Sequence, residues 1–140
     1  MANQHINENC GVALLSSTSS VNMNQDTTLV TLYTPPTGKR AIITMVVIRD
    51  PSASLAGCDD VDFGVGATAA VEAFLNNETG IADMTATTDY MVLTAASDEY
   101  TIIDGDDTTT ANRIFGMYLV SGSTGAATAT IDVFGYLFDS

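Results

Sequence analysis

The sequence predicts an all-β fold, an antiparallel β-sandwich of jelly-roll type with eight or nine strands. Two observations carry this prediction. Apolar segments are short, rich in Val, Ile, Leu, Tyr and Phe, and separated by turn residues, and no stretch has the length and periodicity of a long helix. Since neither a linker nor a repeat interrupts the pattern, residues 11–140 are expected to form one domain, preceded by a flexible arm over residues 1–10.

The first half of the domain is expected to begin with strands over residues 11–16 and 27–33. Residues 34–38, Thr-Pro-Pro-Thr-Gly, end the second strand, because proline cannot donate to a sheet and Gly38 allows a tight reversal. The strongest strand follows over residues 39–49, and its interior, AIITMVVI, is apolar on both faces. Such a strand is typical of the centre of a sheet, covered on each side by the core or by a neighbouring subunit.

Residues 61–65 alternate sufficiently to predict a further strand. The next segment, residues 67–77, has no single interpretation. Its sequence ATAAVEAFLNN contains good helix formers but is short, so a helical turn and a strand ending at Leu75 fit it equally well.

The last strands are expected in the second half of the chain. Residues 90–95 and 100–104 are predicted to form a hairpin around residues 96–99, and residues 114–121 and 127–138 to form two long strands. In the final strand the side chains alternate between two faces, of which one is expected to face the core. The core face is the row Ala129, Ile131, Val133, Gly135 and Leu137.

The charge of the chain limits its partners. Seventeen Asp and Glu residues stand against four Lys and Arg residues, which gives a formal net charge of −13. Nucleic acid and anionic membranes are therefore not expected as partners, because both are bound by clustered cations. The acidity is also what adaptation to saline water would produce. The cations are interpreted as neutralisers of acidic neighbours rather than as an anion site, and they are Lys39, Arg40, Arg49 and Arg113.

The sequence lacks the residues of most enzyme sites, so neither catalysis nor a cofactor is expected. His5 is the single histidine, which excludes Ser-His-Asp and Cys-His sets and the common zinc sites. Cys10 and Cys58 stand far apart without a C-x-x-C motif and are expected to be reduced, with a single bond between them as the alternative. The longest apolar run is far shorter than a membrane helix needs, and no signal peptide is visible, so a soluble protein made in the cytoplasm is expected.

Two groups of aspartates are the candidate metal ligands. Carboxylate oxygens suit calcium, but neither group matches the EF-hand spacing, since Phe115 occupies the closing position after the second group. The favoured interpretation is that both are solvated acidic turns that bind no metal. The candidates are Asp59, Asp60 and Asp62 in the first group, and Asp104, Asp106 and Asp107 in the second.

Residues 32–43, LYTPPTGKRAII, resemble small virion proteins of tailed bacteriophages, in which a YT-P-x-G-K turn leads into a long apolar strand. Residues 129–137, ATIDVFGYL, are similar to the closing strand of those proteins, and residues 62–66, DFGVG, fit the pattern loosely. The resemblance implies a β-sandwich that decorates or cements a capsid shell, often as a trimer. It carries no catalytic residue.

These observations lead to two hypotheses from different classes. The first is a non-enzymatic capsid decoration or cement protein, made in the host cytoplasm, which binds the major capsid protein on the outside of the virion as a homotrimer. The alternative is a carbohydrate-binding or calcium-dependent binding module on a jelly roll. Under the first hypothesis the arm is the candidate partner-binding segment, with residues Ala2, Asn3, Gln4, His5, Ile6 and Asn7.

Overall fold

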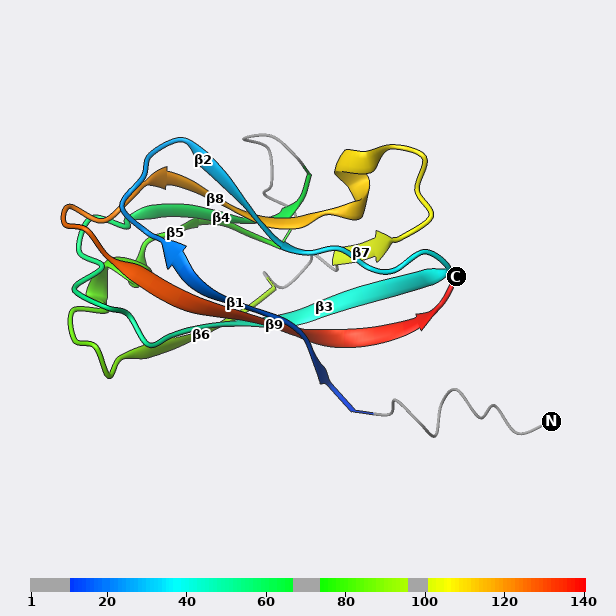
Figure 1. The fold of residues 1–140 in the computed structure, drawn as a ribbon, viewed down its shortest axis with the longest axis horizontal. Coiled ribbons are helices and arrows are strands. Elements are labelled where there is room, and N and C mark those ends of the chain that lie inside the picture. Colours follow the sequence, from blue (N-terminus) through cyan, green and yellow to red (C-terminus); the bar gives the residue numbers. More distant parts are fainter. Residues whose placement is uncertain (1–10, 67–73, 96–100) are drawn as a thin grey trace.

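The computed structural model describes residues 11–66, 74–95 and 101–140, which form two β-sheets packed face to face (Figure 1). The predicted all-β antiparallel sandwich is therefore confirmed. Within the described residues no helix is long and apolar enough to cross a membrane. The elements are β1 (Ala13–Asn22), β2 (Thr28–Tyr33), β3 (Lys39–Arg49), β4 (Asp60–Val65), β5 (Leu75–Glu78), the 3-10 helix η1 (Gly80–Asp83), β6 (Tyr90–Thr94), β7 (Thr101–Asp104), the 3-10 helix η2 (Thr110–Arg113), β8 (Phe115–Ser121) and β9 (Thr128–Asp139).

The strand order of the two sheets is that of a jelly roll. Sheet A has the order β1-β9-β3-β6, with β7 also paired to β3, and sheet B has the order β2-β8-β4-β5. The chain crosses between the sheets in six steps, from β1 to β2, β2 to β3, β3 to β4, β5 to β6, β7 to β8 and β8 to β9, so that neighbouring strands come from distant parts of the sequence. The predicted jelly-roll type and the expected number of strands are both confirmed for the described residues.

The core lies between the sheets and is built from alternate positions of the long strands. On β3 the inward side chains of Ala41, Ile43, Val46 and Ile48 are buried. On β9 the expected core row is confirmed, because Ala129, Ile131 and Val133 are buried and Leu137 packs against the core. The rings of Phe74 and Phe115 meet edge to face with centroids 5.5 Å apart, and both are fully buried.

The turn before β3 forms as predicted and is held by its neighbours. The Lys39 amide donates to the Pro36 carbonyl (3.1 Å), and Gly38 adopts a left-handed φ of 78°. The chain end is tied to the same turn, because the Ser140 amide donates to the Gly38 carbonyl (3.1 Å). Gly105 lies so close that an added Cβ would come within 2.2 Å of the Pro36 carbonyl oxygen.

The hairpin predicted between residues 90–95 and 100–104 is wrong. β6 pairs with the second half of β3, at 45–49, and β7 with its first half, at 40–43. Because β9 occupies the other edge of β3, β6 and β7 lie end to end along the same edge instead of side by side. Both strands thus pair with β3 instead of with each other. The turn predicted at 96–99 lies outside the described residues.

Two other expectations are revised. The strand predicted at 11–16 extends to Asn22 in β1, where two irregularities in register keep it paired with β9 through a polar, serine-rich sequence. Of residues 67–77, only the last part is described. There β5 begins at Leu75, where the predicted strand was to end, and pairs with β4; residues 67–73 lie outside the described residues.

Candidate interaction surface

The second group of candidate calcium ligands forms a loop closed by its own hydrogen bonds. It follows β7, next to the turn before β3, and each of its carboxylates accepts hydrogen bonds from the protein. These contacts hold the loop against the turn and the chain end. Asp104 accepts from the Arg40 side chain and the Asp106 amide. Asp106 accepts from the Gly38 amide and the Ser140 hydroxyl. Asp107 accepts from the Thr109 amide and the Asn112 side chain.

The first group lies on and just before β4. The buried Asp62 accepts a hydrogen bond from the Asn77 amide (2.8 Å) and so joins β4 to β5. The pKa of Asp60 is raised, first by desolvation and then by repulsion from Asp62 and Asp59. Among the described residues no three His, Cys, Asp or Glu side chains are arranged to hold a metal ion. The structure thus places Asp62 and all three aspartates of the second group in hydrogen bonds within the protein.

Cys58 is a core residue rather than a reactive thiol. It is free and fully buried, and burial, followed by the charge of Asp59, raises its pKa to about 11. Because the thiolate is the reactive form, burial and the raised pKa both disfavour reaction of this thiol at neutral pH. Cys10 and the candidate arm residues 2–7, including His5, lie outside the described residues.

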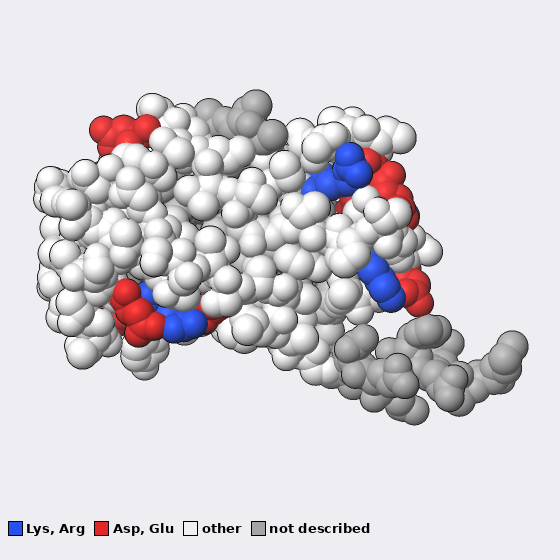
Figure 2. Space-filling view, in the orientation of Figure 1, with Lys and Arg blue, Asp and Glu red and all other residues white. Residues whose placement is uncertain are grey.

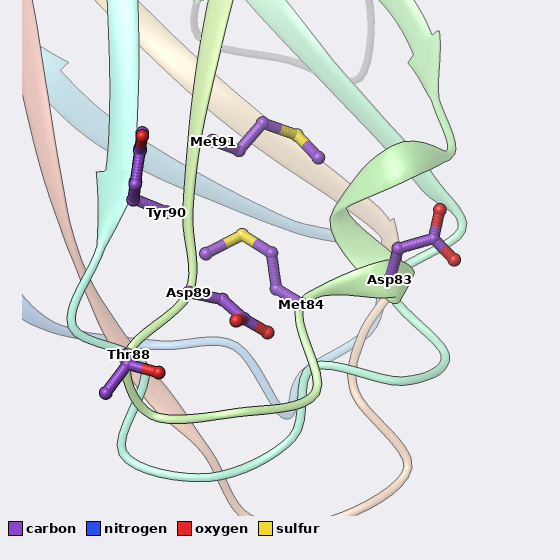
Figure 3. A pocket seen from close by; sticks show the side chains of 6 residues that line it. All are labelled: Asp83, Met84, Thr88, Asp89, Tyr90 and Met91. Carbon is purple, nitrogen blue, oxygen red and sulfur yellow. The ribbon is translucent and has the colours of Figure 1, made fainter.

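An open hollow of about 320 Å³ lies between η1 and β6. Its lining is Asp83, Met84, Thr88, Asp89, Tyr90 and Met91. In Figure 3 the two methionines occupy its centre, whereas Tyr90 lies on the other side of β6. Asp89 closes its own loop by accepting a hydrogen bond from the Ala86 amide (2.8 Å).

The prominent surface feature of the described residues is the outer face of sheet A, the side turned away from the core. All the large hydrophobic side chains that are exposed in the described residues belong to its strands or, for Val12, directly precede β1. They are Val12, Leu14, Tyr90, Val92, Ile102, Tyr136 and Phe138, which are between 37% and 73% exposed. A monomer rarely exposes so many large apolar side chains on one sheet, so the face has the character of a contact surface.

Strand register places these side chains in adjoining rows. Ile42 stands opposite both Tyr136 on β9 and Ile102 on β7. In the next rows Phe134 lies between Leu14 and Met45, and Val47 lies opposite Val92. Side chains opposite one another in neighbouring strands are in contact distance, so these rows form an apolar strip across the centre of the sheet, in which Asp132 stands on the β9 side of Val47.

An ion pair borders the strip at each end. Near one end Arg40 binds Asp104 (2.8 Å), and near the other the Arg49 Nε donates to Asp132 (2.7 Å). Arg49 also pairs with Asp50, and Lys39 pairs with Asp139 at the chain end. On the side shown in Figure 2 the cations lie beside acidic residues. The prediction that the cations neutralise acidic neighbours is confirmed for Lys39, Arg40 and Arg49, while Arg113 donates to the Thr110 hydroxyl.

The ion pairs shift the pKa values of their carboxylates. Burial alone would raise the pKa of Asp132, but hydrogen bonds from Arg49 and Ser17 and the charge of Arg49 outweigh it and hold the pKa below its usual value. The pKa of Asp104 is lowered mainly by a hydrogen bond from the Asp106 amide and then by Arg40. Both native carboxylates therefore bind protons less readily than in the unfolded chain.

Replacing Asp132 with asparagine is expected to flatten the acid dependence of stability. Because its native pKa is depressed, Asp132 contributes stability above its unfolded pKa, about 3.9, and loses it as the pH falls through the lower native pKa. Urea midpoints measured from about pH 7 to 2 should differ most between wild type and Asp132→Asn above about pH 5 and converge in acid. A constant difference over the whole range would contradict this account.

Sequence reasoning found part of this surface. It recognised that residues 39–49 are apolar on both faces, but it did not connect Leu14, Val92 and Ile102 with them. The signal was present, since the short strands at 90–94 and 101–104 also carry apolar residues at consecutive positions. Only the register along β3 shows that these residues share one face.

The fold and surface define a jelly-roll sandwich with one uncovered apolar sheet face. No protein-family model matches the chain, and no curated protein matches it. Among solved structures, a chain in the capsid of Ralstonia phage GP4 has a TM-score of 0.52 at 11% identity, over 92% of this chain and 83% of that one. This similarity shows a shared fold.

Two weaker structural similarities carry no argument about fold or function. One is to a chain of the cyanophage Pam1 capsid asymmetric unit, with a TM-score of 0.48 at 13% identity over 90% of this chain and 83% of that one. The other is to a chain in the acidic stable capsid structure of Helicobacter pylori bacteriophage KHP30, with a TM-score of 0.49 at 11% identity over 93% and 97% of the two chains.

Proposed function

We propose that this protein is a non-enzymatic virion structural protein, a capsid decoration or cement protein that binds the outside of the major capsid shell and stabilises it. The observation that carries the proposal is the uncovered outer face of sheet A. Its apolar centre and paired charges at the ends match the apolar core and polar rim of protein interfaces. A rigid sandwich with such a face is suited to binding other proteins.

Two further observations support a virion role. The alignment with the chain of the Ralstonia phage GP4 capsid covers 92% of this chain and 83% of that one, so the likeness extends over most of both chains. Independently, the turn and strand at residues 32–43 resemble small virion proteins of tailed bacteriophages. Because fold likeness alone does not establish function, the proposal depends on these observations together with the surface.

The proposed partners follow from the same hypothesis. The protein is proposed to be made in the host cytoplasm, to form a homotrimer and to bind the major capsid protein, without nucleic acid or membrane. Residues 1–10 are proposed as an arm that becomes ordered on the shell, with contacts from residues 2–7. Net acidity of −13 would keep free subunits apart in solution until a specific contact overcomes their repulsion.

Deleting residues 2–7 is expected to leave the sandwich folded and to weaken shell binding at least tenfold, about 1.4 kcal/mol or more. The reason is that the deleted residues precede β1 in the sequence and are assigned only to the partner. Binding is measured by co-sedimentation of the full chain and the deletion variant with shells assembled from the major capsid protein.

The matched control is a chain in which residues 2–7 are kept in number but reordered, with thermal melting of all three proteins as the folding check. Equal binding of the full chain and the deletion variant would remove the arm from the proposal. Failure of the full chain itself to bind shells would overturn the proposed function.

A further inference from the structure

The outer face of sheet A has no cover from any described part of the chain. Its central strands β3 and β9 present Ile42, Met45, Val47, Phe134 and Tyr136 outward, while the opposite sides of the same strands form the core. We propose that copies of this chain associate through this face, so that a second copy covers it. A contact that uses the same face on both copies is two-fold and pairs two copies, so this inference goes beyond the proposed homotrimer, and it is tested on the isolated chain without a shell.

The distribution of charge selects another copy as the occupant. The strands of sheet A contain three cations and three carboxylates, and every cation is paired with one of these carboxylates, in the pairs Lys39–Asp139, Arg40–Asp104 and Arg49–Asp132. The strands are therefore neutral as a group. The entire net charge of −13 comes from the remainder of the chain.

This neutrality matters because two copies of a strongly acidic chain repel one another. Approach through sheet A brings neutral, apolar surfaces together and keeps the acidic parts apart, so its electrostatic cost is the lowest available. A basic partner would instead be attracted to the acidic parts of the molecule. The face fits an apolar, neutral surface, and its own counterpart on a second copy is such a surface.

The size of the face is sufficient for a specific contact. Four strand positions about 4.8 Å apart and strands of roughly ten residues at about 3.3 Å per residue give roughly 19 by 33 Å, or about 630 Å² per copy. A contact that used the face on both copies would bury roughly 1,250 Å² in total, within the range of about 1,200–2,000 Å² found for specific interfaces.

The ends of the face add specificity to this contact. Arg40 and Arg49 keep more than two fifths of their side chains exposed while paired to their aspartates. A guanidinium has five N–H donors, and its paired carboxylate accepts only some of them. The remaining donors can bind acceptors on a neighbouring copy. The apolar strip thus supplies the area and the paired charges fix the orientation.

The experiment compares the solution mass of four chains by size-exclusion chromatography with light scattering from about 1 to 200 μM, a range that brackets micromolar association. Wild type is expected to be an oligomer of identical chains, and Val92→Asp and Ile102→Asp are each expected to weaken association at least tenfold. These two residues are on different strands and are 50% and 56% exposed, so aspartate can be solvated in the monomer. The matched control is Thr31→Asp, an exposed position on β2 of sheet B, which should keep the wild-type mass.

Thermal melting of each variant separates loss of association from loss of folding, and having two variants on separate strands keeps one local defect from deciding the result. A monomeric wild type over the whole range would overturn the proposal, as would an oligomer that persists in both face variants. If wild type is monomeric but Val92→Asp loses shell binding, the face belongs to the shell contact, so that self-association fails while the proposed function stands.

Discussion

Phe115→Ala is expected to lower the free energy of unfolding by about 3–5 kcal/mol, the cost of removing a large buried aromatic side chain. Phe115 is fully buried at the start of β8, a strand paired on both edges within sheet B. Its ring contacts Phe74 edge to face at 5.5 Å and an interplanar angle of 86°. The paired strands on either side prevent the space from closing, so a cavity would remain.

The change is measured by urea unfolding at neutral pH. The matched control is Phe138→Ala, which removes the same side chain from β9 where it is 38% exposed, and it should cost well under half as much as Phe115→Ala. Similar losses of unfolding free energy in the two variants would contradict the assignment of this stability to packing in the core between the sheets.

Gly135→Ala should destabilise the protein by about 3 kcal/mol or more, through overpacking between two central strands. A Cβ at this position would lie 2.0 Å from the Ile42 carbonyl oxygen and 3.1 Å from the Ile43 Cα. These are backbone atoms of β3, which pairs with β9 along almost its whole length, so neither strand can move aside without breaking the sheet. The close approach is next to the irregularity in register between Ile43 and Met45.

The control for this variant is Gly125→Ala, in the loop before β9, where an added Cβ meets nothing within 4 Å. It should be neutral or slightly stabilising, because alanine reduces the freedom of the unfolded chain. Thermal and urea unfolding of both variants give the comparison. Equal stabilities of Gly135→Ala and Gly125→Ala would contradict the close approach of β9 to β3 at Gly135.

The contrast between the two halves of the chain shows what local patterns predict. The prolines and Gly38 marked the turn before β3, and the apolar run after it marked β3 itself, whose bounds match the expected residues 39–49. Both features depend on residues next to one another in sequence. The hairpin expected at 90–104 failed because two apolar strands with a loop between them pair locally only when no better partner is present. β3 is that partner, more than forty residues away.

The acidic segments illustrate the same difference. Their composition predicted turns, which agrees with the loop formed after β7, but it could not show that Asp106 holds both Gly38 and the chain end. Nor could it show that Asp62 is buried against β5. Each of these contacts joins residues more than ten positions apart, so no window along the chain contains both partners.

By itself the sequence determined the all-β class, the limits of most strands and the core row of β9, because alternation and turn chemistry are local properties. Tertiary structure alone decided the strand order, the placement of β6 and β7 along β3, and the gathering of Leu14, Val92 and Ile102 on one neutral face. The physical reason is that sheet register is a long-range property: it sets which distant residues share a surface, and the proposed contact depends on that surface.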